Sequence, residues 1–237
     1  MGLGLRSRSL SWTTPTDFRD TDSRGERIVT GRLYSARVGE ALRFAAEAHA
    51  TQARKGKPDE PYLSHILTVA GMVAHFGGDE DQIIAGVLHD AVEDAGGATM
   101  ADRIRREFGD RVADIVLECS DAVPDQVDQK GPWKPRKLEY IARLRAGGSE
   151  DALLVEACDK LANLYDIVED LEFDTEPTFD KFNGGREGTL EYYATLSEVL
   201  MPQVHVPALT AEYARLLGRL MELSGVDVIR TWSADET

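Results

Sequence analysis

The segment Ile83–Asp94 places four side chains that can bind a metal or move a proton inside an apolar run. In an α-helix of 3.6 residues per turn, His89 lies one turn from Glu93, and Asp90 lies one turn from Asp94. Ionised groups are costly to bury without a partner, so a core helix with these side chains needs a common ligand, and a divalent cation can satisfy them. The alternative is a solvated face on a half-exposed helix.

Two further polar residues stand within apolar stretches of other expected helices. His65 lies at the start of an expected helix 64–76, and Asp159 lies in a long expected helix 149–171 with Asn163 one turn later. Taken alone, each is typical of a capping or surface residue. The order of a histidine, a His-Asp pair and a distant aspartate on separate helices can assemble a mononuclear metal site in a helical bundle.

Helical periodicity covers most of the chain after residue 34. We expect an all-α fold with one helical-bundle domain at 34–225, a flexible or loosely docked N-terminal arm at 1–33 and a C-terminal tail at 226–237. No stretch predicts a strand. The expected helices are 35–54, 64–76, 79–94, 99–108, 111–120, 135–145, 149–171, 187–201 and 207–223.

Charge and cysteine content limit the setting in which the protein works. The 237 residues include 42 Asp and Glu against 27 Lys and Arg, a formal net charge of −15, which argues against general nucleic-acid or anionic-membrane binding. Cys119 and Cys158 lie in helical patterns outside any CxxC pair, as is typical of reduced thiols. No apolar run predicts a membrane span or a secretion signal, and we predict a cytoplasmic protein.

The order of these residues resembles that of the HD-domain metal-dependent phosphohydrolase superfamily, and in more detail the hydrolase domain of the RelA/SpoT alarmone enzymes. The resemblance extends over about 41–171. We expect no room for a synthetase or regulatory domain after it, so the chain is similar to the stand-alone small alarmone hydrolases. Lys160 and Ala162 stand where the family usually has an arginine and a histidine. The matching segments are Ala48-His49, Arg54-Lys55-Gly56, Pro61-Tyr62, His65, Leu88–Asp94, Phe108-Gly109 and Asp159–Asn163.

This resemblance implies an enzyme that removes the 3′-pyrophosphate from guanosine tetra- or pentaphosphate, or from an adenosine equivalent, to give GDP or GTP and pyrophosphate. It implies Mn²⁺ as the cofactor, although two imidazoles and two carboxylates also suit other divalent metals. It implies Glu93 and Asp94 as the acid/base and water-orienting pair. The metal ligands that it implies are His65, His89, Asp90 and Asp159.

The resemblance also implies substrate contacts, with Arg54 and Lys55 near the substrate and Asn163 near its ribose or phosphate. These two cations supply the local patch that a phosphate-rich ligand needs in an acidic chain. A second basic stretch, 130–137, combines cations with an indole that could stack on a nucleotide base, and its alternative is an exposed loop with one packed tryptophan. Its candidate contacts are Trp133, Lys134 and Arg136.

Two other functions remain open from the sequence. One is a different HD phosphohydrolase or nucleotidase, because Lys160 and Ala162 differ from the residues that the alarmone hydrolases usually have there. The other is an antitoxin that neutralises a cognate alarmone synthetase, either by degrading its product or by direct binding through the acidic surface. In each case we expect a nucleotide polyphosphate or its synthetase as the partner, and the sequence predicts no oligomeric state.

Overall fold

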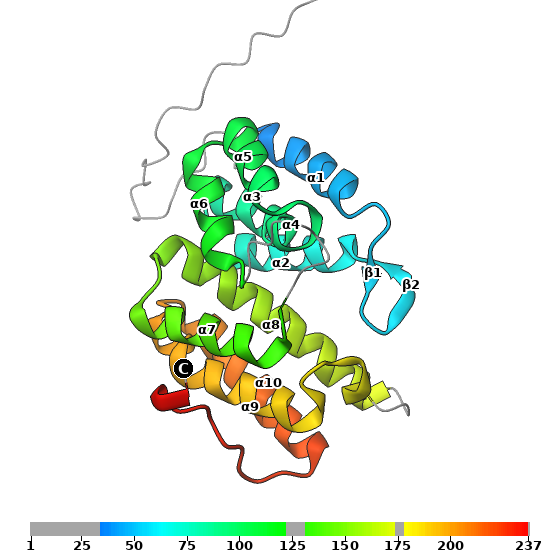
Figure 1. Cartoon of the computed structure of the whole chain (residues 1–237), viewed down its shortest axis with the longest axis vertical. Helices are drawn as coiled ribbons and strands as arrows, with labels where there is room; N and C mark the ends of the chain where they lie inside the picture. Colours follow the sequence, from blue (N-terminus) through cyan, green and yellow to red (C-terminus); the bar gives the residue numbers. More distant parts are fainter. Residues whose placement is uncertain (1–33, 122–130, 174–177, 237) are drawn as a thin grey trace, which may run out of the picture. The chain divides into compact units, whose positions relative to one another are not determined.

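A computed structural model of the chain describes residues 34–121, 131–173 and 178–236 (Figure 1). The predicted N-terminal arm, residues 1–33, lies outside the described residues. Ala36–Thr237 forms one compact unit, separate from Met1–Ser35. The described part of the larger unit is almost entirely helical, which confirms the all-α fold class.

The secondary structure of the described residues consists of α-helices, short 3₁₀-helices and one antiparallel hairpin. None of these helices is long and apolar enough to span a bilayer. The hairpin pairs β1 (Ala53–Arg54) with β2 (Lys57–Pro61). The 3₁₀-helices are η1 (Thr178–Lys181), η2 (Met201–Gln203) and η3 (Ala234–Glu236). The α-helices are α1 (Arg37–Ala48), α2 (Leu63–His75), α3 (Glu80–Leu88), α4 (Ala91–Ala95), α5 (Gly97–Phe108), α6 (Asp110–Cys119), α7 (Trp133–Ala146), α8 (Glu150–Phe173), α9 (Gly185–Val199) and α10 (Pro207–Ser224).

Helix α8 forms the centre of the unit. It packs against α2, α3, α6 and α10, and Figure 1 shows it running between the group α1–α6 and the group formed by α7, α9 and α10. Leu161, Leu164 and Ile167 are fully buried in these contacts. Apolar contact on nearly every side is typical of a helix in the interior of a bundle. Any polar group that α8 carries is therefore held in a largely water-free setting.

The expected helix 79–94 is divided in two in the structure, which corrects the prediction of one continuous helix. Helix α3 ends at Leu88 and α4 begins at Ala91. The Nδ1 atom of His89 donates a hydrogen bond to the carbonyl of Gly86 at 2.8 Å, the oxygen that the amide of Asp90 would use in a continuous helix. The break between the two helices thus falls at the His-Asp pair, where a side chain shares this carbonyl.

The expectation of no strand was wrong for the segment after α1. The first helix ends at Ala48 rather than at Arg54, and the hairpin β1–β2 follows in a region predicted as helix end and loop. Gly56 makes the turn with φ of +80°, a backbone conformation that favours glycine. The prolines and charged residues of β2 have low strand propensity, so the sequence alone did not predict this strand.

The predicted C-terminal tail, 226–237, packs into the unit through Trp232, which is 1% exposed. Its amide donates to the Oγ1 atom of Thr195 at 2.9 Å, and its Nε1 atom donates to the Oε2 atom of Glu191 at 2.8 Å. The side chain of Arg145 donates to the carbonyl of Trp232 at 2.5 Å. The segment around Trp232 is therefore an integral part of the folded unit.

We predict that Trp232→Ala lowers the free energy of unfolding by about 3–5 kcal/mol, because it removes a large buried ring. Urea denaturation followed by circular dichroism measures the change. Val228→Ala is the matched control, since Val228 is 85% exposed and its truncation should cost no more than about 0.5 kcal/mol. Equal stability of the two variants would show that Trp232 is not anchored in the core.

Candidate functional site

Three buried side chains from three helical segments meet at one point. His65 comes from the first turn of α2, His89 follows the end of α3, and Asp159 comes from the middle of α8. One donor atom from each lies within 4.8 Å of the others. The Oδ1 atom of Asp159 is 3.1 Å from the Nε2 atom of His65 and 3.6 Å from that of His89.

Asp90, in the turn between α3 and α4, completes the group of four predicted ligands. Its Oδ2 atom is 2.9 Å from the Nε2 atom of His89 and 3.7 Å from that of His65. The hydroxyl of Tyr62 donates to the same oxygen at 2.5 Å and so fixes its orientation. The break between the two helices is thus what brings Asp90 beside the histidine that precedes it.

The donor set fits a divalent metal. The Nε2 atoms of His65 and His89 are buried and form no hydrogen bond in the structure, although both face carboxylate oxygens. Because Nδ1 of His89 donates to Gly86, its Nε2 atom is available as a ligand, which is the usual state of a metal-binding imidazole. Two imidazole nitrogens and two carboxylate oxygens suit manganese, iron or zinc.

A buried chain of polar groups supports Asp159 from within the core. Asn163 donates to its Oδ1 atom at 2.6 Å, and Lys160 donates to its Oδ2 atom at 2.6 Å. Lys160 also lies 3.3 Å from Glu156, which accepts a hydrogen bond from Tyr140. Burial opposes ionisation of Asp159, but Lys160 and the two histidines hold its pKa well below the usual value. The carboxylate therefore stays ionised while buried.

Helix α4 presents the two acidic residues predicted as the proton-transfer pair. Glu93 and Asp94 both line the pocket beside Asp90. The Nε2 atom of Gln52 donates to Asp94 at 2.8 Å, and the Oε1 atom of Gln52 lies 2.7 Å from Nδ1 of His49. Since an amide oxygen only accepts, the imidazole donates. His49 is thus linked to the candidate site through Gln52, a connection that the sequence did not reveal.

Arg136 lies on the other side of Glu93, outside the residues that line the pocket. Its Nη1 atom is 3.6 Å from Glu93, and it forms an ion pair with the buried carboxylate of Asp121. Burial would raise the pKa of Asp121, but Lys137 and Arg136 together lower it. Arg136, which the sequence predicted as a substrate contact, therefore lies where it can hold Glu93 in position.

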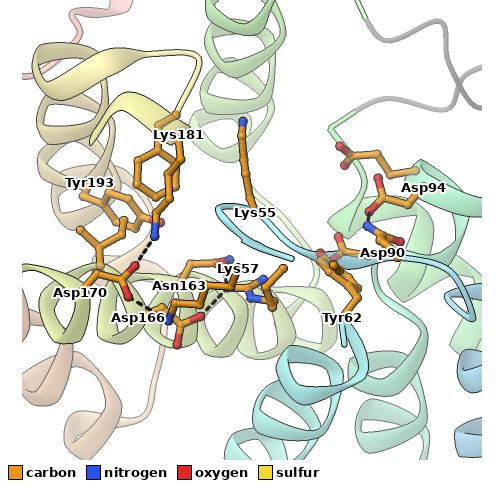
Figure 2. Close-up of a pocket in the computed structure, with 16 residues that line it drawn as sticks. Lys55, Lys57, Tyr62, Asp90, Asp94, Asn163, Asp166, Asp170, Lys181 and Tyr193 are labelled. Atoms are coloured by element: carbon orange, nitrogen blue, oxygen red, sulfur yellow. Dashed lines mark hydrogen bonds and ion pairs between the residues drawn. The ribbon is translucent and has the colours of Figure 1, made fainter. Parts of the chain in front are cut away.

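The candidate pocket opens beside these acidic residues and has a volume of about 300 Å³. In Figure 2, Tyr62, Asp90 and Asp94 stand at one end, and Asp170 and Lys181 stand at the other. Residues of β1, β2, α4, α8 and α9 line it together with the segment around η1. The lining residues are Gln52, Ala53, Arg54, Lys55, Lys57, Tyr62, Asp90, Glu93, Asp94, Asn163, Asp166, Ile167, Asp170, Lys181, Phe182 and Tyr193.

The predicted cations Arg54 and Lys55 both line this pocket, as does Asn163. Arg54 pairs with the carboxylate of Asp166 and donates to the Oδ1 atom of Asn163 at 3.2 Å. Burial would lower the pKa of Arg54, but Asp166 more than offsets this and raises it. Lys55 extends from the hairpin at the pocket (Figure 2). Its Nζ atom donates to the Oδ1 atom of Asn183 at 3.4 Å.

Trp133 and Lys134 are not among the residues that line the pocket, so no contact in the structure supports their predicted role in substrate binding. The Trp133 ring packs edge-on against Tyr192 and Trp232. It lies so close to Gly184 that an added Cβ there would stand 2.6 Å from the ring. Lys134 lies 5.6 Å from the centre of the Trp232 ring. The alternative of a packed tryptophan therefore describes this segment.

Several lining residues escaped the sequence argument. Asp166 and Asp170 follow Asp159 by seven and eleven residues, a spacing that keeps them on one helix face and could have identified them. The others lie in or next to the hairpin, in the segment before α9 and in α9 itself, where spacing within one helix gives no comparable signal. The missed residues are Gln52, Lys57, Tyr62, Asp166, Asp170, Lys181, Phe182 and Tyr193.

We predict that His65→Ala weakens the binding of Mn²⁺ by at least about a hundredfold, because the loss of one direct ligand should exceed the effect of losing a supporting contact. Isothermal titration calorimetry on protein treated with chelator and dialysed gives the affinity. His75→Ala is the matched control, because the ring of His75 packs on Phe76. Equal affinity in both variants would exclude His65 as a ligand.

Comparison with known proteins places the chain in a family. The family model described as HD domain matches residues 41–190. The guanosine-3′,5′-bis(diphosphate) 3′-pyrophosphohydrolase MESH1 of Xenopus tropicalis is 38% identical over 135 residues, which span 56% of this chain and 70% of the relative. MESH1 of Homo sapiens is 35% identical, with the same coverage of both chains.

A solved structure supports the same relationship. It is described as a metazoan ortholog of SpoT that hydrolyses ppGpp, and it superposes with a TM-score of 0.57 at 25% identity, covering 81% of this chain and 97% of its own. The range that the family model matches, residues 41–190, includes His65, His89, Asp90 and Asp159. The chain therefore belongs to the HD domain family and, within it, to the MESH1 type.

Proposed function

We propose that this chain is a metal-dependent pyrophosphohydrolase that removes the 3′-pyrophosphate from guanosine-3′,5′-bis(diphosphate) to give GDP and pyrophosphate. The observation that carries the proposal is a pocket that reaches the predicted ligand set at Asp90 and joins Glu93 and Asp94 to a wall of cations. Such a pocket suits a substrate with a cleavable phosphate at one end and further negative charge at the other. The activity in the names of the relatives supports this choice of substrate.

The proposed metal ligands are His65, His89, Asp90 and Asp159, with Mn²⁺ as the proposed ion. A divalent metal bound there would lower the pKa of a water molecule and polarise a phosphoryl oxygen. The protein positions these ligands through contacts behind them: Tyr62 orients Asp90, and Asn163 and Lys160 orient Asp159. Ligands held in this way need little rearrangement when the ion binds.

The proposed reaction is the attack of water on the phosphorus that is bonded to the ribose 3′ oxygen. The bond from this oxygen to phosphorus breaks, the ribose 3′ oxygen leaves and gains a proton, and the attacked group, now carrying the oxygen of the water, is released as pyrophosphate. Glu93 or Asp94 accepts the proton of the attacking water, because both carboxylates line the pocket next to Asp90. Gln52 holds Asp94 and Arg136 supports Glu93, so that each acts from a fixed position.

The proposed substrate contacts are Arg54, Lys55 and Asn163. Arg54 presents its guanidinium to the pocket while Asp166 holds it in place, and this planar group is suited to phosphate oxygens. Phe182 and Tyr193 are aromatic residues of the lining and offer faces on which a purine can stack. They take the role that the sequence argument gave to Trp133.

We propose that the relation to the predicted partner, a cognate alarmone synthetase, is indirect: this chain degrades the product that the synthetase makes. An enzyme that degrades the alarmone opposes a synthetase without any contact between the two proteins. We further propose the cytoplasm as the place of action, which suits the free thiols of Cys119 and Cys158.

Purified protein with Mn²⁺ should convert guanosine-3′,5′-bis(diphosphate) to GDP and pyrophosphate, measured by anion-exchange chromatography of the products. Addition of EDTA and the substitution Asp90→Ala should each reduce the rate by at least about a thousandfold, because both remove the metal-dependent chemistry. Asp102→Ala, which removes an exposed carboxylate of α5, is the matched control. Intact nucleotide after incubation with the metal-loaded wild type would refute the proposed activity.

A second prediction concerns the link from His49 to Asp94. Gln52→Met keeps the length of the side chain but removes both hydrogen bonds, so kcat should fall by about tenfold or more while the affinity for Mn²⁺ stays the same. His49→Phe should change kcat in the same direction by a smaller factor. Steady-state kinetics and metal titration separate the two effects. If Gln52→Met kept the kcat of the wild type, Gln52 would have no role in positioning Asp94.

A further inference from the structure

Helix α8 carries a stripe of polar residues that begins at the predicted metal ligand Asp159 and continues along the pocket. Asp159, Asn163, Asp166 and Asp170 are separated by four, three and four residues, which places them on one face of the helix. At 1.5 Å per residue, the eleven steps from Asp159 to Asp170 span about 16 Å. This distance is of the order of an extended nucleotide with phosphates at both ends. The stripe therefore connects the metal ligand Asp159 with a second charged group far from the reacting bond.

That second group is an ion cluster at Asp170, whose side chain is 5% exposed. The Nζ atom of Lys57 lies 2.8 Å from its Oδ1 atom, and Lys181 forms an ion pair with its Oδ2 atom. Lys57 is also 3.9 Å from Glu60 at the edge of the hairpin. Burial would raise the pKa of Asp170, but the hydrogen bonds from both lysines lower it. Lys57, Lys181 and Asp170 all line the pocket, so the cluster presents two ammonium groups and one carboxylate to it, while Glu60 lies outside the lining.

The cluster is assembled from three separate segments, and contacts between them hold the lysines in place. Lys57 comes from β2, Asp170 from α8 and Lys181 from η1. The turn at Gly56 lies directly on the side chain of Lys181, because an added Cβ there would stand 2.6 Å from its Cδ atom. Figure 2 shows Lys181 reaching Asp170 at the end of the pocket opposite Asp90 and Asp94.

We propose that Lys57, Lys181 and Asp170 form a second anion subsite that binds the 5′-phosphates of the substrate while the 3′-pyrophosphate lies at the metal ligands. This inference rests on the proposed function. Asp90, Glu93 and Asp94 make the other end of the pocket acidic, so a second polyanionic group is directed along α8 toward the lysines. Each ammonium has three donors, and Asp170 occupies only part of them.

The subsite makes the enzyme selective for nucleotides with phosphates on both sides of the ribose. Asp170 holds both lysines in position before the substrate binds, which reduces the entropy lost on binding. A nucleoside 3′-diphosphate with a free 5′-hydroxyl would reach the reacting groups but leave the lysines without a phosphate. Its KM should therefore be higher than that of a substrate with a 5′-diphosphate.

The test compares kcat and KM for four guanosine 3′-diphosphates that carry a hydroxyl, monophosphate, diphosphate or triphosphate at the 5′ position. The wild type should show a KM that falls as 5′-phosphates are added. In Lys57→Met/Lys181→Met, the ratio of KM between the 5′-hydroxyl and 5′-diphosphate substrates should shrink by at least about tenfold. A general disturbance of the fold would change all four substrates alike and leave this ratio intact.

Lys134→Met is the matched control, because it removes an exposed lysine outside the pocket and should keep the wild-type ratio. Lys57→Met alone leaves the ion pair between Lys181 and Asp170 intact, and it replaces the double variant in the test if that variant does not fold. In Lys57→Met, the KM ratio between the 5′-hydroxyl and 5′-diphosphate substrates should shrink by a smaller factor. A wild-type ratio in the folded variants, or equal KM for all four substrates in the wild type, would overturn the subsite. Failure of the wild type to cleave any 3′-diphosphate would instead refute the proposed function.

Discussion

The burial of two imidazoles and one carboxylate beside a second, half-buried carboxylate is the constraint on which the rest of the structure depends. Such groups are costly to remove from water unless they meet partners or a metal. The chain meets this cost by local means: the break after α3 brings Asp90 to His89, and Tyr62 orients Asp90. Lys160 and Asn163 hold Asp159 from behind. The central helix can carry a carboxylate only because these contacts surround it.

Helix α8 also explains how an acidic protein can attract a polyanion. A net charge of −15 opposes phosphate binding over the molecule as a whole, yet the cations of the pocket are held at short range by carboxylates of α8. Asp166 holds Arg54, and Asp170 holds Lys57 and Lys181. Ion pairing fixes the cations without exhausting their hydrogen-bond donors. Charge is thus organised locally, and the overall composition says little about this site.

The features that the sequence predicted are those with a local periodic signal. Long amphipathic helices such as α8 and α10 follow from spacing alone, and His65, His89, Asp90 and Asp159 stood out because they interrupt apolar runs. The hairpin β1–β2 gave no such signal, since its prolines and charges disfavour a strand. It forms because it is anchored by tertiary contacts, of which the ion pair between Lys57 and Asp170 is one. Contacts of this kind cannot be derived from spacing within one segment.

The two aromatic sets near α9 show why residue type alone did not identify the purine contact. Trp133 lies within a basic stretch, but its ring packs in the space that Gly184 and Gly188 leave, where a larger residue would collide with it. Packing of that indole fixes the start of α9 and with it the adjacent pocket wall, where Phe182 and Tyr193 line the cavity. A partly buried tryptophan therefore acts on the site through the packing of the wall that other aromatic residues form.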